Sequence, residues 1–421
     1  MTRGISMKLI PALMMGLFSS YASAAGFQLL EQNASGIGNA YAGSAAVAEN
    51  ASTIFYNPAG MTQLQAHEVS GGLTAVNTSF KFADNGSSVG LLAGSGNGGD
   101  GGSLGVIPNG YLSWALNKDL YIGVGIGAPF GLKTEYDTPW LGAAQSTSFD
   151  IKTYNINPSI AYRVNDKVSL GAGVSWQRLT AEYKRQAAVV SGTLVASPLK
   201  LTLDDDSWGW NVGALFTLSP STKVGVSYRS AIKYDLTGNI SVSGPSAPTN
   251  AALSSGATAS LKLPDVFILS VTQQLSDKWQ MLGDVSWTGW SSIPKLDVLR
   301  SSGALAQTLD TDFRDTWRVA LGANYKYSDA IKLKFGVAHD QTPIKGEATR
   351  LVSLPDNDRT WLSFGAQWMP SKGSAVDVGV SYLFVKDAKI DNNQTALGRG
   401  RVTGTYSDSA WILGGQYSLA F

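Results

Sequence analysis

The chain has 421 residues, no cysteine and a net charge of +1 at pH 7. Charged residues make up 15% of it, against about 25% in ordinary soluble domains, while glycine occurs 47 times and tryptophan 12 times. The lack of cysteine excludes a disulfide framework, and the small net charge gives no long-range attraction to nucleic acid. So little charge is unusual for a soluble surface but suits a surface in contact with lipid.

The N-terminus has the three parts of a secretory signal peptide. Lys8 precedes an apolar run over 9–18, and the small residues that follow end in Ala22-Ser23-Ala24. A basic head, a short apolar core and an A-x-A site predict the removal of residues 1–24. The alternative is a membrane anchor, for which this run is short.

Residues 25–66 show no sustained alternation and are rich in alanine, glycine, asparagine and serine. They also contain apolar and aromatic side chains that a solvated tail would lack: Phe27, Leu29, Leu30, Tyr41, Ile54, Phe55, Tyr56 and Met61. We therefore expect a compact segment, with a disordered tail as the alternative. Inside a wide barrel, such a segment would plug the lumen.

From residue 67 to the end, the sequence alternates with a period of two, which puts neighbouring side chains on opposite faces of a sheet. On one face, the last strand carries Trp411, Leu413, Gly415, Tyr417, Leu419 and Phe421. The pattern recurs at 317–327 and 376–384. An apolar face opposite a small or polar one predicts lipid outside and a wet lumen inside. A soluble β-sandwich also alternates, but its strands are shorter, about 5–6 residues.

The connections between these stretches are short and long in turn. The tight ones are Asn117-Lys118-Asp119, Asn165-Asp166-Lys167, Ser219 to Thr222, Ser276-Asp277-Lys278, Ser328-Asp329 and Pro370 to Gly373. The long ones lie at roughly 83–108, 131–148, 186–206, 241–258, 294–311, 344–356 and 389–404. Tight periplasmic turns, long outer loops and an even strand number are typical of outer-membrane barrels. The tight turns make six hairpins, and strands at about 68–82 and 405–421 bring the total to fourteen.

The predicted fold is therefore all-β: a fourteen-stranded antiparallel transmembrane β-barrel over 67–421, with an N-terminal hatch formed by 25–66 inside the lumen. About eight strands are just filled by their own side chains, so fourteen leave room for a plug. The chain ends on Phe421. A terminal aromatic residue on a closing strand resembles the assembly signal that the outer-membrane barrel assembly machinery reads.

The third strand contains a feature that should interrupt it. Tyr121 to Gly127 alternates, and Ala128-Pro129-Phe130-Gly131-Leu132 follows. Pro129 cannot donate a hydrogen bond to a neighbouring strand, and Gly131 tolerates unusual backbone angles, so strand pairing should break here. The alternative is that 128–131 simply begins an outer loop.

Several segments together resemble the FadL family of outer-membrane transporters for fatty acids and other hydrophobic compounds. In the hatch they are Ala25-Gly26-Phe27-Gln28-Leu29, Ser35-Gly36-Ile37-Gly38, Ala40-Tyr41-Ala42-Gly43 and Asn57-Pro58-Ala59. In the barrel they are DFRDTWRVALG from Asp312, LPDNDRTWLSF from Leu354 and VDVGVSY from Val376. The resemblance spans the whole mature chain. It implies a barrel that captures its ligand at outer loops, holds it in an inner pocket and releases it sideways beside a kinked third strand. The expected loop at 186–206 is short for such an outer capture groove.

The resemblance also implies particular site residues. Pro129, Phe130 and Gly131 would form the lateral opening, and Phe27 would touch the apolar part of the ligand. Arg185 and Arg314 would hold its carboxylate, since a guanidinium pairs a carboxylate bidentately. The alternatives are that each arginine pairs with an acid of the wall, such as Asp312 or Asp315 near Arg314, and that Phe27 only packs.

We therefore expect a passive, gated channel for long-chain fatty acids, acting as a monomer among the lipid and lipopolysaccharide of a Gram-negative outer membrane. Aromatic hydrocarbons of the toluene or xylene type are the alternative ligands. A general porin is disfavoured by the hatch. A lipid hydrolase would need a serine–histidine pair on the wall. The two histidines, His67 and His339, are far apart in sequence, so we expect neither catalysis nor a metal site or other cofactor. The run Asp204-Asp205-Asp206 is expected in a solvated outer loop rather than at a bound ion.

Overall fold

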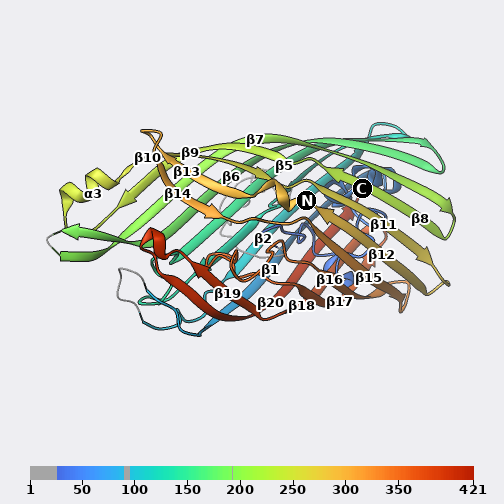
Figure 1. The fold of residues 1–421 in the computed structure, drawn as a ribbon. Helices are drawn as coiled ribbons and strands as arrows, with labels where there is room; N and C mark the ends of the chain where they lie inside the picture. The colour runs from blue at the N-terminus through green and yellow to red at the C-terminus, as the bar shows by residue number, and fades with distance from the viewer. Residues whose placement is uncertain (1–25, 90–94, 192) are drawn as a thin grey trace, which may run out of the picture.

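The computed structural model describes residues 26–89, 95–191 and 193–421, so the expected signal peptide at 1–24 lies outside the described residues. One antiparallel sheet of twenty strand segments closes on itself as a barrel of tilted strands (Figure 1). Six of the spans are each divided into two segments, and the described residues therefore form fourteen spans. They are β1 (His67–Asp84), β2 (Leu104–Ala115), β3 with β4 (Leu120–Gly127, Gly131–Glu135), β5 (Ser148–Asn165), β6 (Val168–Ser191), β7 (Thr193–Ser219), β8 with β9 (Thr222–Arg229, Ile232–Val242), β10 with β11 (Ser255–Leu263, Val266–Gln274), β12 with β13 (Trp279–Thr288, Lys295–Arg300), β14 with β15 (Leu305–Asp310, Thr316–Lys326), β16 (Ile331–Asp340), β17 (Arg359–Ser371), β18 with β19 (Ser374–Val385, Ala388–Asn393) and β20 (Arg401–Ala420).

The first and last strands close the barrel. β1 pairs with β20 from Glu68 opposite Ala420 to Asp84 opposite Gly404, and β1 pairs with β2 on its other side. The six tight turns expected from the sequence each join two consecutive spans. The predicted fourteen-stranded antiparallel barrel is confirmed.

The outer face of the wall is apolar, as the alternation predicts. The inner face does not match the predicted wet lumen. On β20, Trp411 is 54% exposed and Leu413 is 62% exposed, whereas Ile412 between them is fully buried. The outward residues form the lipid-facing surface. The inward face is not simply wet, because Ile412 packs in one apolar cluster with Ala34 and Ile37 of the N-terminal segment. The lumen is therefore largely a packed interior.

The prediction of an outer loop at 186–206 is wrong. β6 continues to Ser191 and β7 begins at Thr193, so this stretch is a long hairpin whose strands pair from Val168 opposite Phe216 outward. The aspartates at 204–206 accordingly lie on β7, and Asp204 pairs with Arg178 of β6 at 2.5 Å. Leu199, Leu201 and Leu203 do alternate there, but they face inward and the residues between them are polar, which is the reverse of the lipid-facing pattern.

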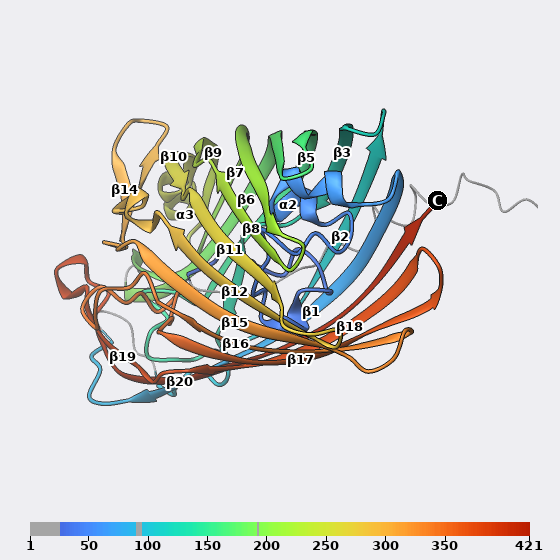
Figure 2. The same ribbon diagram turned by 90° about the vertical axis from the view of Figure 1, so that its right-hand side faces the viewer.

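Residues 26–66 occupy the lumen, where their blue ribbon lies within the ring of strands (Figure 2). Hydrogen bonds tie this hatch to distant parts of the wall: the Ala34 N–H donates to Gln416 at 3.1 Å and the Thr62 hydroxyl donates to Ser169 at 2.7 Å. Its helical turns are η1 (Ile37–Asn39), α2 (Thr53–Tyr56) and η2 (Pro58–Gln63). A plug with wall contacts on several sides cannot be a solvated tail.

The outer end of the lumen is also covered. The segment 341–358 folds inward and buries Ile344, Leu351, Val352 and Leu354 in the largest apolar cluster of the molecule. The other helical turns lie in connections: α3 (Ala247–Leu253), η3 (Trp290–Ser292) and η4 (Thr395–Leu397). None of the helices in the described residues is long and apolar enough to span a membrane.

Candidate ligand-binding site

An apolar cavity with an empty volume of about 720 Å³ lies between the hatch and the inward-folded segment 341–358. Alternate residues of the wall strands point into it, because a strand presents every second side chain to the lumen. Its walls include Phe149 and Ile151 of β5, Ala181 and Tyr183 of β6, Leu201 and Leu203 of β7, Leu236 of β9, Leu261 of β10, Leu309 of β14, Phe313, Leu351, Leu354 and, from the hatch, Phe27.

Arginine side chains gather beside this cavity. Arg185 follows Tyr183 by two residues on β6 and therefore lies on the same face, where its Nε donates to Gln307 at 3.2 Å. Arg300 and Arg399 lie close enough to act electrostatically on Arg185, and Arg399 also acts on Tyr183. Burial lowers the pKa of Arg399 below its ordinary value.

The arginine cluster (Arg185, Arg300 and Arg399) has backbone and amide partners but no acid. Arg300 donates to the Leu253 carbonyl at 2.8 Å, and Arg399 donates to the Gln394 side chain at 3.2 Å. In the part of the chain that the structure describes, none of the three forms an ion pair. Buried positive charge without a counter-ion favours the binding of an anion. The cavity and the arginine cluster together suit a ligand with an apolar body and an anionic head.

Arg314, the other arginine singled out in the sequence, is placed differently. It lies between β14 and β15 with its side chain 46% exposed, its Nε donating to the Thr342 carbonyl at 3.1 Å and its terminal nitrogen 3.8 Å from Asp358. The structure therefore does not bring it into contact with Arg185. Neither acid considered from the sequence is its partner: Asp312 pairs with Lys345, and Asp315 accepts from Ser291.

The third span is interrupted between Gly127 and Gly131, at the residues where the sequence predicts a break. β3 pairs with β2, from Gly110 opposite Ile126 to Ala115 opposite Tyr121, and also with β5, whereas β4 pairs with β5. Residues 104–109 of β2 pair with β1 on one side. No pairing among the described residues joins them to β4 on the other, so the wall has a gap in its hydrogen-bonded ladder.

The hatch binds the backbone of this interruption. Leu29 donates its N–H to the Pro129 carbonyl at 2.7 Å, and Gly131 donates its N–H to the Phe27 carbonyl at 2.8 Å. The ring of Phe27 lies 6.0 Å from that of Phe130. Because Phe27 also lines the apolar cavity, one residue connects the cavity, the hatch and the gap.

Gln32 of the hatch makes a second contact with the backbone between β3 and β4. Its side-chain amide donates to the Ala128 carbonyl at 2.7 Å, and its side-chain oxygen accepts from the Ala128 N–H at 3.0 Å. A single glutamine thus satisfies both backbone groups that a neighbouring strand would otherwise pair. No local sequence pattern indicates this role, because the contact depends on where the hatch lies in the lumen.

The Asn57-Pro58-Ala59 motif fixes the lower part of the hatch on the wall. The Asn57 amide donates to the Ala214 carbonyl of β7 at 2.9 Å, and its oxygen accepts from the Ala59 N–H at 3.1 Å. The approach is so close that a Cβ at Gly213 would lie 2.0 Å from the Asn57 oxygen. The motif is therefore held against the barrel at a wall position where any side chain would displace Asn57.

A buried ion cluster that sequence reasoning missed fixes the opposite side of the hatch. Lys334 of β16 is 1% exposed and pairs with Glu49 of the hatch at 2.7 Å and with Asp377 of β18 at 3.0 Å. Burial opposes ionisation of Glu49, but Lys332 and Lys334 outweigh it and hold its pKa well below the ordinary value. The available signal was the pair of lysines at inward positions in 331–338, where the other residues of β16 are apolar or glycine.

Glu31 of the hatch is fully buried, and neither of its carboxylate oxygens has a hydrogen-bond partner in the described residues. Burial raises the pKa of Glu31 from its ordinary value of 4.5 to about 7. Arg318 and Arg359 act against this rise, and Asp340 adds to it. Glu31 is next to Gln32 in the sequence, so its protonation state affects the stability of the segment that binds the third span.

The hatch is expected to be held more firmly at low pH. Because the folded-state pKa of Glu31 is raised, the stability that it contributes is fully present below pH 4.5 and is lost as pH rises through about 7. A shift of this size corresponds to on the order of 3 kcal/mol. Amide hydrogen-exchange protection of the hatch, measured from pH 4.5 to 7.5, should decline more in the native protein than in Glu31→Gln. Equal slopes in the two proteins would contradict this role of Glu31.

Comparisons with known proteins agree with this architecture. The family model described as "Outer membrane protein transport protein (OMPP1/FadL/TodX)" matches residues 15–421. The chain is 29% identical to the long-chain fatty acid transport protein of Escherichia coli, over 97% of each chain. It is 30% identical to outer membrane protein P1 of Haemophilus influenzae, over 88% of each.

Solved structures show the same fold. A Pseudomonas aeruginosa FadL homologue superposes with a TM-score of 0.87 at 24% identity, covering 94% of this chain and 99% of that one. The Pseudomonas putida toluene transporter TodX superposes with a TM-score of 0.72 at 16% identity, covering 92% and 98%. The shared architecture thus extends over nearly the full length of both comparison structures.

Proposed function

This chain belongs to the family of outer membrane transport proteins that includes OMPP1, FadL and TodX, and from that membership we propose that it carries long-chain fatty acids across the outer membrane by passive diffusion. The observation that supports this ligand class is the apolar cavity beside the arginine cluster. A fatty acid has the same division into a long apolar tail and one anionic group. The outer-membrane location follows from the family and the lipid-facing barrel.

The energetics suit a passive carrier. Moving a methylene group from water into apolar surroundings is worth about 0.8 kcal/mol, so a long tail gains substantially in the cavity. The carboxylate would meet Arg185 and Arg399 in a largely buried setting, where charge-assisted hydrogen bonds are strong. Among aliphatic and aromatic ligands, this pairing favours an acid over a neutral hydrocarbon of the toluene or xylene type.

We infer that the ligand leaves sideways through the gap between β2 and β4. Phe27 lines the cavity and its backbone is bonded to Gly131 beyond the interruption, so a ligand that displaces Phe27 also loosens the hatch there. Exit into lipid keeps the tail out of water throughout. The space between the hatch and the wall below the cavity is lined in part by Asp284, Arg318 and Asp340, and these charged side chains oppose passage of a long tail.

The chain is proposed to have no catalytic role. His67 stacks on Trp114 at 3.8 Å between ring centroids, and His339 lies on the lipid-facing side of β16. A serine–histidine hydrolase needs an imidazole hydrogen-bonded to its nucleophile, and we find no such bond to either histidine in the described residues. We further propose a monomer surrounded by outer-membrane lipid and lipopolysaccharide, inserted by the barrel assembly machinery through its last strand.

Native mass spectrometry of the purified protein tests the ligand class. Protein freed of lipid and then offered oleate and toluene together should retain oleate, and protein purified directly should carry mass additions equal to long-chain fatty acids. Retention of the hydrocarbon in preference to the acid would instead support the aromatic-hydrocarbon alternative.

A further inference from the structure

Pro108 of β2 lies on the edge of β2 that borders the gap. Ala115 donates its N–H to the Ala66 carbonyl on the β1 side at 2.6 Å. Leu116 donates its N–H in the opposite direction, to the Leu120 carbonyl at 2.8 Å. Because the backbone groups of successive residues in an antiparallel strand point alternately to its two neighbours, Pro108 directs its backbone toward β3 and β4. A proline has no N–H to donate, so it is tolerated on such an unpaired edge.

The residue that would face Pro108 is Ala128. In the register of β2 and β3, Gly110 lies opposite Ile126, and the pairing ends there. The same register continued by two residues would place Pro108 opposite Ala128. In such a pair each residue accepts the N–H of the other, and the Ala128 carbonyl would find no donor at Pro108. The first bond needed to close the gap is therefore missing from the β2 side.

Gln32 of the hatch takes the place of that missing partner. Its side chain makes both hydrogen bonds to the Ala128 backbone, at 2.7 and 3.0 Å. Its own backbone carbonyl accepts from the Tyr111 hydroxyl of β2 at 2.6 Å. The fully buried Gln32 thus connects β2 to the end of β3 without a bond between the two strands themselves at this level.

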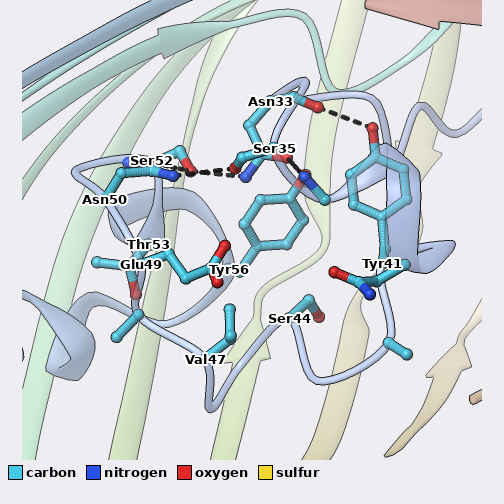
Figure 3. A pocket seen from close by; sticks show the side chains of 14 residues that line it. Asn33, Ser35, Tyr41, Ser44, Val47, Glu49, Asn50, Ser52, Thr53 and Tyr56 are labelled. Atoms are coloured by element: carbon cyan, nitrogen blue, oxygen red, sulfur yellow. Dashed lines mark hydrogen bonds between the residues drawn. The ribbon is translucent and has the colours of Figure 1, made fainter. Parts of the chain in front are cut away.

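Contacts within the hatch hold Gln32 in this position. The backbone carbonyl of its neighbour Asn33 accepts from the Tyr41 hydroxyl at 2.8 Å, a bond that Figure 3 shows beside the small cavity of the hatch. The Asn33 side chain donates to the Ser52 hydroxyl at 2.6 Å. The hold on Ala128 therefore depends on how the hatch is seated.

The edges of β2 and β4 meet again beyond the gap. Glu135, the last residue of β4, donates its N–H to the Gly101 carbonyl at 3.0 Å. Pro108 lies at the other end of the gap, nearer the tight turn at 117–119. Its neighbours Ile107 and Asn109 are buried on the inner side, so the Pro108 ring faces outward. Pro108 thus acts on the pairing of the wall and not on the contents of the lumen.

We propose that Pro108 is a positioning residue of the lateral opening: it withholds the N–H that would pair β2 with Ala128, so that the hatch, and not the wall, holds the end of β3. The inference rests on the proposed lateral exit. When a ligand displaces the hatch, β2 cannot replace Gln32 as the partner of Ala128. The opening then stays open while the ligand passes.

The direct test gives position 108 an N–H in a protein whose Ala128 is free of Gln32. Pro108→Val suits this outward position, because valine is apolar and favoured in strands. Added to Gln32→Ala, it should slow hydrogen exchange at the Ala128 amide roughly fivefold, the factor expected for one added hydrogen bond. Mass spectrometry at single-residue resolution measures the rate. An unchanged rate at Ala128 would overturn the proposal.

The matched control is Pro198→Val, also added to Gln32→Ala. Pro198 is another exposed proline of a wall strand, and its carbonyl accepts from the Ser243 N–H at 2.9 Å, far along the chain from the gap. It should leave exchange at Ala128 unchanged. The same slowing with Pro198→Val would show a general effect of removing a proline and would also overturn the proposal.

The consequence for transport is measured as the initial rate of oleate uptake by cells. Uptake with Pro108→Val and Gln32→Ala together should be severalfold lower than with Gln32→Ala alone, while the purified proteins bind oleate equally, because the cavity is unaltered. Equal uptake by the two, in barrels that heat-modifiable mobility shows to be folded, would refute the role of Pro108. Should the native protein fail to bind oleate, the proposed function fails, and the exchange rate at Ala128 still decides what Pro108 does.

Discussion

Oleate binding is expected to weaken by roughly 100-fold or more when Arg185 and Arg399 are both replaced by alanine, because each charged hydrogen bond to the carboxylate contributes about 1.5–3 kcal/mol. Binding of oleyl alcohol, which has the same tail and no charge, should change little. Neither arginine forms an ion pair in the described residues, so the double variant leaves no buried acid unpaired and should still fold. Isothermal titration of the purified proteins with both ligands measures the difference.

Arg314→Ala is the informative comparison for this experiment. Its guanidinium is half exposed and lies near Asp358, so we expect a smaller loss of oleate affinity than for Arg185→Ala. An equal loss would support the sequence-based expectation that Arg185 and Arg314 share the carboxylate. If the double variant loses acid and alcohol equally, the arginine cluster supports the cavity wall and does not recognise charge.

Uptake of oleate is expected to fall steeply when residues 128–131 are replaced by Val-Thr-Val-Thr. An alternating strand would extend the pairing of β3 along residues 104–109 of β2 and close the gap. The barrel should remain folded, because closing an edge adds backbone hydrogen bonds. Growth on oleate as sole carbon source measures uptake, and heat-modifiable electrophoretic mobility confirms the folded barrel.

Gln32→Ala is the control that distinguishes the effect of closing the gap from the effect of weakening the contact between the hatch and the third span. It removes both hydrogen bonds to Ala128 but leaves the wall open, so uptake should be retained. A folded Val-Thr-Val-Thr variant with normal uptake would refute lateral exit at this position. It would point instead to passage of the ligand through the hatch, which crosslinking residues 25–66 to the wall could then examine.

The sequence alone predicted the fourteen strands of the barrel and its tight turns, but not the extension of β6 and β7 through 186–206. Alternation such as Trp411, Ile412 and Leu413 records which side chains face lipid, and tight turns such as Ser328-Asp329 record where the chain reverses. Both signals depend on residues that are neighbours in the sequence, so they can be recognised before the fold is known. Pro129 likewise marks an interruption through its own missing N–H.

The binding site was decided only by the tertiary structure. Arg185 could be singled out, but Arg300 and Arg399 come from other strands and loops, and they approach Arg185 only because the barrel closes. Lys334 meets Glu49, and Gln32 meets Ala128, for the same reason. Pairing across a closed sheet and the seating of a hatch are set by contacts between residues far apart in the chain, and no local pattern records which of those residues will meet.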